Sequence, residues 1–163
     1  MKKTIYFDLD GVLRNLGKSI FGKHPESWGE KKDGKGFIEY VNDNPDYLIK
    51  AEPTKYLDVA LEEFPRKILI MTVQLPKWID YTEKWLDKYV GKDRYLVMYV
   101  PPDTKVDIMD EVKGLLVEDH PNLSSYEKII LIDRPYNRNV KLPMFRVDTK
   151  ERLRNVIRMY RQW

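Results

Sequence analysis

The chain has 163 residues, the length of one ordinary domain or of a domain that carries a small insert. Hydrophobic residues make up 42% of the chain and aromatic residues 12%, which excludes an intrinsically disordered protein. The net charge is only +3, from 29 basic and 26 acidic residues, so we do not expect stable nucleic-acid binding, although mild basicity suits an anionic substrate. Cysteine is absent, which excludes disulfide bonds and thiolate metal sites and leaves oxygen-ligated metals open.

The N-terminus gives no sign of export. It reads Met-Lys-Lys followed by a short mixed strand, without the apolar stretch of a signal peptide. No apolar run approaches the length needed to cross a bilayer. We therefore expect a cytoplasmic protein that does not contact a membrane.

The first predicted strand ends in two carboxylates. Residues 4–13 read Thr-Ile-Tyr-Phe-Asp-Leu-Asp-Gly-Val-Leu. Alternation along a strand would send Asp8 and Asp10 to the same side, and Gly11 permits a sharp turn after them. An open α/β sheet binds ligands outside the carboxyl ends of its strands, so two acids there suit a magnesium ion and a phosphate. The alternative is a strand that happens to end in Asp-rich turn chemistry.

This stretch resembles the first motif of the haloacid dehalogenase superfamily of phosphohydrolases. That motif reads hhhDxDGhh, with h apolar, and residues 5–13 match it throughout. The resemblance implies that Asp8 attacks phosphorus, that Asp10 handles the proton of the leaving group, and that Mg²⁺ is the cofactor. It also implies three further motifs, in order, downstream.

Residues 14–52 are rich in Gly, Lys, Asn and Asp and show little periodicity, apart from a short predicted helix over 37–41. A loop of this length in a compact domain is usually functional or has structure of its own. In the superfamily, an insertion at this place is a cap that closes over the site. We therefore expect residues 14–52 to form a small cap and residues 1–13 and 53–163 to form the catalytic core. An ordinary surface excursion is the alternative. The cap aromatics that could contact a substrate are Phe21, Trp28, Tyr40 and Tyr47.

The second motif of the superfamily is an apolar strand that ends in Ser or Thr. An apolar stripe at helical spacing over 57–64 predicts a helix, and residues 68–73 then read as a buried strand. Thr72 lies near the end of that strand. The resemblance implies that its hydroxyl holds a phosphate oxygen, although Thr is also common in ordinary strands.

A Lys near the start of a helix is the third motif. Residues 76–90 predict a helix with a broad apolar face, and residues 95–100 predict a third strand. Lys105 follows that strand. A cation there would screen Asp8 from the incoming phosphate and neutralise developing charge.

An apolar strand that ends in an acidic pair, often Asp-Asp, is the fourth motif. Residues 114–119 predict such a strand, but the first acid here is Glu118, which departs from the pattern. Glu also ligates magnesium, so whether Glu118 or Asp119 reaches the metal stays open. The expected metal ligands are Asp8, the backbone carbonyl of Asp10, and Glu118 or Asp119. Surface acidity at a strand end is the alternative.

A fifth predicted strand, 128–133, is followed by Arg-Pro-Tyr-Asn-Arg. This segment resembles one that borders the site of small deoxyribonucleotidase-like phosphatases of bacteria and phages. Arg134 or Arg138 could meet a phosphate, and a structural turn is an equal alternative. A short edge strand at 145–147 and a helix over 151–162 complete the chain.

Together these patterns predict an α/β fold: a Rossmann-like parallel sheet flanked by helices, with a small cap inserted after the first strand. The resemblance to the 5′(3′)-deoxyribonucleotidase family implies a magnesium-dependent phosphomonoesterase whose substrate is a small nucleoside monophosphate, with candidate contacts at Trp28, Tyr40 and Arg134. A sugar-phosphate phosphatase, a polynucleotide 3′-phosphatase and a non-catalytic nucleotide-binding module are the alternatives. A homodimer, the base and the position of the phosphate stay open.

Overall fold

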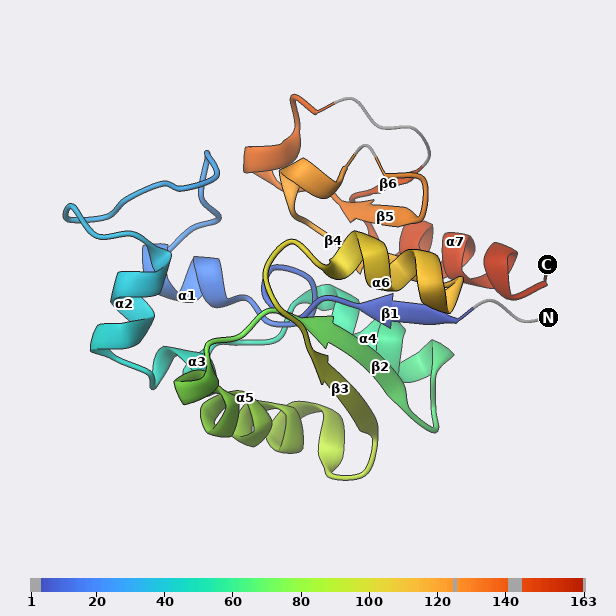
Figure 1. Cartoon of the computed structure of the whole chain (residues 1–163), viewed down its shortest axis with the longest axis horizontal. Helices are drawn as coiled ribbons and strands as arrows, with labels where there is room; N and C mark the ends of the chain where they lie inside the picture. Colours follow the sequence, from blue (N-terminus) through green and yellow to red (C-terminus); the bar gives the residue numbers. More distant parts are fainter. Residues whose placement is uncertain (1–3, 125, 141–144, 163) are drawn as a thin grey trace.

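Six parallel strands form one sheet in the computed structural model, which describes residues 4–124, 126–140 and 145–162. The strands lie in the order β3-β2-β1-β4-β5-β6, so β1 occupies the middle beside β2 and β4 (Figure 1). Their bounds are β1 Ile5–Phe7, β2 Ile68–Thr72, β3 Tyr95–Tyr99, β4 Leu115–Glu118, β5 Ile129–Ile132 and β6 Phe145–Val147. The predicted α/β fold with a parallel sheet flanked by helices is confirmed.

Helices cover both faces of the sheet, which explains the continuous apolar runs of β4 and β5. On one face, side chains of β1, β2, β4 and β5 pack against α4 (Lys55–Glu63), α5 (Ile79–Leu86) and α7 (Lys150–Gln162). On the other face they pack against α6 (Lys105–Val112). Because successive residues of a strand face opposite ways, Phe7 and Val117 join the first core and Leu116 joins the second.

The predicted core helices are confirmed, with one difference. The helix expected over 76–90 is divided into a 3₁₀ turn at Pro76–Trp78, α5, and a π-helical turn at Asp87–Gly91. Strand β3 is an edge strand and only half-buried, because β2 is the one strand of the described ranges that pairs with it. Helix α4 begins at Lys55, where the Thr54 side chain accepts a hydrogen bond from the backbone N–H of Tyr56 at 3.1 Å.

Residues 14–52 contain three short helices, α1 (Leu16–Phe21), α2 (Phe37–Asp43) and α3 (Tyr47–Lys50). Only α2 was expected from the sequence. The three helices share a small apolar cluster, to which Trp78 of the core also contributes. The segment leaves and rejoins the core at one point, because the N–H of Asn15 donates to the carbonyl of Glu52 at 2.9 Å. Figure 1 shows α1 and α2 beyond the ends at which the strand arrows point.

None of the helices in the described ranges is long and apolar enough to cross a bilayer. In the described part of the chain, two further 3₁₀ turns, at Pro121–Leu123 and Pro135–Asn137, follow β4 and β5, as the turn at Pro76–Trp78 follows β2. The turns therefore lie at the carboxyl edge of the sheet, beyond which α1 and α2 lie (Figure 1).

Candidate active site

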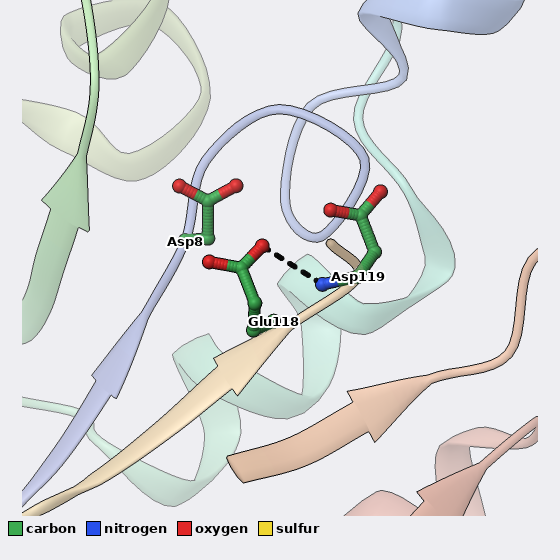
Figure 2. Close-up of side chains that lie close together, drawn as sticks. All are labelled: Asp8, Glu118 and Asp119. Atoms are coloured by element: carbon green, nitrogen blue, oxygen red, sulfur yellow. Dashed lines mark hydrogen bonds between the residues drawn. The ribbon is translucent and has the colours of Figure 1, made fainter. Parts of the chain in front are cut away.

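Three buried carboxylates meet where β1 and β4 end side by side. Asp8 follows β1, and its N–H donates to the carbonyl of Val117 at 2.8 Å, which continues the pairing of the two strands. Glu118 is the last residue of β4 and Asp119 follows it. Each of the three side chains offers one oxygen, and these oxygens all lie within 4.8 Å of one another. Figure 2 shows how the two adjacent strand ends bring the three side chains together.

Lys105, the first residue of α6, is the cation of this cluster. Its Nζ donates to Asp8 Oδ1 at 2.7 Å and to Glu118 Oε2 at 2.6 Å, and its side chain is buried. Although burial opposes the charged form, Asp8 and Glu118 raise the pKa of Lys105, which keeps it protonated. One ammonium group therefore faces three carboxylates in a buried space.

Burial and the neighbouring charges shift the pKa values of the three carboxylates. Burial and the neighbouring Glu118 raise the pKa of Asp8 to about 7, although Lys105 opposes the shift. Burial, Glu118 and Asp8 raise the pKa of Asp119 well above its usual value. Burial also acts on Glu118, but Lys105 outweighs it and holds the pKa of Glu118 below the usual range.

The hydrogen bonds give Glu118 and Asp119 different surroundings. Glu118 Oε2 is bound by Lys105, and Oε1 accepts from the N–H groups of Asp119 at 2.9 Å and His120 at 3.2 Å. Asp119 Oδ2 accepts from the hydroxyl of Tyr136. Within the described residues, no protein group donates to Asp119 Oδ1. Both oxygens of Glu118 are thus occupied, whereas Asp119 keeps one oxygen for a ligand.

The glycine of the first motif is required by a close approach. Gly11 has φ +87°, in the left-handed region, and a Cβ there would lie 1.8 Å from Asp119 Oδ2. Any side chain at this position would push the loop after β1 away from Asp119. The glycine thus allows the backbone that carries Asp8 and Asp10 to pack directly on the fourth motif.

The Arg-Pro-Tyr-Asn segment ties these loops together. Arg134 Nε donates to the carbonyl of Gly11 at 3.1 Å, and the Arg134 side chain is buried. Asn137 Nδ2 donates to the carbonyls of Asp119 at 2.8 Å and Ile132 at 2.9 Å. These contacts are typical of a structural turn, which is the second of the two alternatives given for Arg134. Arg134 does not line the cavity described below.

Thr72 and Asp10 complete the floor of the site. Thr72 is the last residue of β2 and is buried, and its hydroxyl accepts from Gln74 Nε2 at 3.3 Å. The same Nε2 donates to Asp10 Oδ2 at 2.8 Å. The four side chains expected from the motifs, Asp8, Asp10, Thr72 and Lys105, therefore line one common space.

That space is a cavity of about 720 Å³ between the carboxyl edge of the sheet and the cap. Its floor is acidic, and its walls carry aromatic and aliphatic side chains from both parts of the chain. The cap contributes Phe21, Trp28 and Phe37, and the core contributes Leu75 and Trp78. Tyr40 and Tyr47 do not line it. Phe37 and Trp78 were not among the residues expected to contact a substrate. Phe37 lies in a short predicted helix and Trp78 on the apolar face of another, and both positions predict core packing.

Trp28 links the cap loop to the core. Its ring lies 4.2 Å from the ring of His120 and 5.5 Å from that of Tyr136, measured between centroids, although 52% of the residue is exposed. Tyr136 in turn binds Asp119. Trp28 and Tyr136 therefore connect an exposed part of the cavity wall to Asp119 through successive contacts.

No protein-family model matches this chain, and a search of curated proteins finds no match. Buried carboxylates, an ammonium group and a hydroxyl at the ends of separate parallel strands are suited to binding a divalent cation together with a phosphate.

The raised pKa of Asp8 predicts how the metal-free protein responds to pH. Between the usual pKa of 3.8 and the raised value of about 7, folded Asp8 keeps a proton that the unfolded chain has lost. Raising the pH through this window therefore lowers the free energy of unfolding. At pH 8 in chelator, Asp8→Asn should melt at least about 2 °C above the unchanged protein, since about 1 kcal/mol shifts Tm by about 2–4 °C at this size.

Melting curves at pH 4 and pH 8 check this expectation. The difference between the two proteins should vanish near pH 4, where Asp8 is protonated in the fold. A lower Tm for Asp8→Asn at pH 8 would mean that pairing with Lys105 outweighs burial.

Proposed function

We propose that this protein is a magnesium-dependent phosphomonoesterase that acts through an aspartyl-phosphate formed on Asp8. The observation that supports this most is the convergence of Asp8, Lys105, Glu118 and Asp119 at one end of one cavity, although 97 residues separate Asp8 from Lys105 in the chain. Each of these residues was a candidate from its motif alone. Their meeting in one place is what the phosphatase hypothesis requires.

The donor set fits Mg²⁺. Magnesium prefers hard oxygen ligands, and three carboxylates crowd together with one ammonium. Burial and like-charge repulsion raise the pKa values of Asp8 and Asp119, and a bound cation would relieve the repulsion. We assign Asp8, Asp119 and the backbone carbonyl of Asp10 as ligands, and Glu118 as the residue that positions Lys105. The ion would supply positive charge to a bound phosphate.

The protein's own groups then take separate roles. Asp8 Oδ attacks phosphorus in line, and the bond from phosphorus to the leaving oxygen breaks. Asp10 gives a proton to the departing oxygen and later takes one from the water that hydrolyses the phosphoenzyme. Lys105 and the Thr72 hydroxyl bind the equatorial phosphate oxygens, where positioning and charge contribute most of the rate of phosphoryl transfer.

The walls of the cavity favour a nucleoside monophosphate as the substrate. A volume of about 720 Å³ is within the range of small-molecule sites. Phe21, Trp28, Phe37 and Trp78 offer rings on which a base can stack. A sugar phosphate offers no π-face to these rings and would forgo the stacking. A base exposes a π-face and needs no specific partner there.

Release of phosphate from a panel of nucleotides, sugar phosphates and p-nitrophenyl phosphate tests this proposal. Stacking on an aromatic contributes about 1–3 kcal/mol per base, by analogy with single-strand binding. Trp28→Ala and Phe21→Ala should therefore lower kcat/KM for the preferred nucleotide by roughly tenfold to a hundredfold, and leave kcat/KM for p-nitrophenyl phosphate within about threefold.

Tyr40→Ala is the matched comparison from the same cap. Its ring lies 6.3 Å from that of Phe21 but does not line the cavity, so a smaller loss is expected. Equal losses on both kinds of substrate in the Trp28 and Phe21 variants would remove the support for base recognition. Preferred turnover of sugar phosphates would favour the sugar-phosphatase alternative.

A further inference from the structure

A fully buried arginine lies directly behind Asp10. Arg14 is 0% exposed, and its guanidinium binds the Asp10 carboxylate with two hydrogen bonds, from Nε to Oδ1 at 2.6 Å and from Nη2 to Oδ2 at 2.9 Å. A two-point contact of this kind fixes both the position and the plane of a carboxylate. Arg14 belongs to none of the four motifs, and the proposed reaction leaves it without a role.

The other contacts of Arg14 hold the guanidinium itself in place. Nη1 donates to the carbonyl of Leu48, in α3 of the cap, at 3.0 Å and to the hydroxyl of Thr82, in α5 of the core, at 3.3 Å. The guanidinium carbon lies 5.7 Å from the ring centroid of Trp85. Cap and core thus both contribute to the orientation of this one side chain.

Gln74 closes the network from the side of the cavity. Its Nε2 donates to Asp10 Oδ2, and its Oε1 accepts from the Thr82 hydroxyl at 3.1 Å. Asp10 Oδ2 therefore accepts from both Arg14 and Gln74, whereas Oδ1 accepts from Arg14 alone among the residues that the structure describes. An oxygen of a carboxylate has two lone-pair sites, so Oδ1 is the one that retains a site for a proton.

Fold stability by itself is a weak explanation for this arrangement. Burying an arginine–carboxylate pair costs desolvation free energy that its attraction often fails to exceed, and apolar residues of similar size stabilise a core as well or better. The Asp10 side chain is 19% exposed and lines the cavity, so the network supports a group that remains within reach of a ligand.

We propose that Arg14, assisted by Gln74, is a positioning residue that aims Asp10 Oδ1 at the leaving-group oxygen, and that its bond to Leu48 makes this geometry depend on a seated cap. The inference rests on the proposed phosphatase function. Proton transfer from a positioned acid contributes about 10²–10⁴-fold to a rate. The contribution is large for an alkyl leaving group, which departs poorly as an anion, and small for p-nitrophenolate, which departs without a proton.

The test compares kcat/KM for a nucleoside 5′-monophosphate and for p-nitrophenyl phosphate. This parameter covers the steps up to loss of the leaving group, so the later hydrolysis of the phosphoenzyme does not enter it. Arg14→Met should lower kcat/KM about a hundredfold for the nucleotide and less than about fivefold for p-nitrophenyl phosphate. Arg14→Lys keeps the charge without the two-point contact and should recover part of the loss.

Gln74→Met keeps the inference testable if Arg14→Met does not fold. It removes one of the two donors to Oδ2 and should produce a smaller loss, about tenfold, again confined to the nucleotide. Arg158→Met, which removes an arginine from an ion pair with Glu63 on α4, is the control and should change neither value.

Equal losses on the two esters would assign Arg14 and Gln74 a purely structural role and overturn the inference. The unchanged protein, assayed on both esters, separates this result from failure of the proposed function. If it hydrolyses neither ester in the presence of Mg²⁺, the phosphatase proposal fails and the inference fails with it.

Discussion

Asp8→Asn is expected to lower phosphatase turnover by at least about a thousandfold while the chain stays folded. Loss of a catalytic nucleophile commonly costs rates of this order or more. The amide is nearly isosteric with the carboxylate but is not a nucleophile toward phosphorus. Because the substitution also removes a crowded buried charge, it should not destabilise the metal-free protein. Phosphate release at saturating Mg²⁺, together with a melting curve, measures both effects.

Asp110→Asn is a matched control for this prediction. Asp110 lies on α6, is largely exposed and pairs with Lys128, so the same chemical change occurs away from the cavity. Its turnover should stay within about twofold of the unchanged protein, since surface pairs contribute little. Substantial magnesium-dependent turnover by Asp8→Asn would show that Asp8 is not the nucleophile.

The second large effect concerns Glu118 and Asp119, whose roles the sequence left open. Mg²⁺ at a hundred times its Kd stabilises a folded protein by about 2.7 kcal/mol, which corresponds to roughly 5–10 °C in Tm at this size. Asp119→Asn should remove most of this shift, because it alters the carboxylate that has an oxygen free for the ion. Turnover should fall with it and should require much higher Mg²⁺.

Glu118→Gln is the matched change on the neighbouring residue. Both of its oxygens are bound by Lys105 and by backbone N–H groups, so we expect most of the Mg²⁺-dependent rise in Tm to remain. Turnover should still fall about 10–100-fold, as is typical when a residue that orients a site is changed. If instead Glu118→Gln loses the rise in Tm and Asp119→Asn keeps it, the two assignments must be exchanged. Turnover that persists in excess chelator would contradict the metal site as a whole.

Much of the fold could be predicted from local patterns. Continuous apolar runs indicated strands buried on both faces, and the apolar stripe of α4 indicated its buried face, because burial imposes the period of each element on the sequence. Asp8 follows β1, Thr72 and Glu118 are the last residues of β2 and β4, and Lys105 begins the helix after β3. Parallel strands present their carboxyl ends at one edge of the sheet. The sequence therefore predicted that these side chains meet there, but not the distances between them.

Only the tertiary structure decided which neighbours these residues have. The sequence could not separate Glu118 from Asp119, because their roles depend on Lys105 and Tyr136, which come from elsewhere in the chain. It placed Trp28 and Tyr40 in one polar insert, but one lines the cavity and the other does not. The insert has little periodicity, so nothing local encodes which of its side chains face inward.

Arg14 shows this limit most clearly. By sequence it is one charged residue after an apolar run, and charged residues are almost never fully buried unless paired. Its burial depends on Asp10 four residues earlier, on Leu48 in the cap and on Thr82 in α5. Local sequence indicated that Asp10 lies at the carboxyl end of the first strand, and the structure has it in the loop that follows β1. The packing of residues 14–52 against the core determined which groups hold Asp10 in place. Residues far apart in the chain make these contacts, and no local pattern in either segment predicts them.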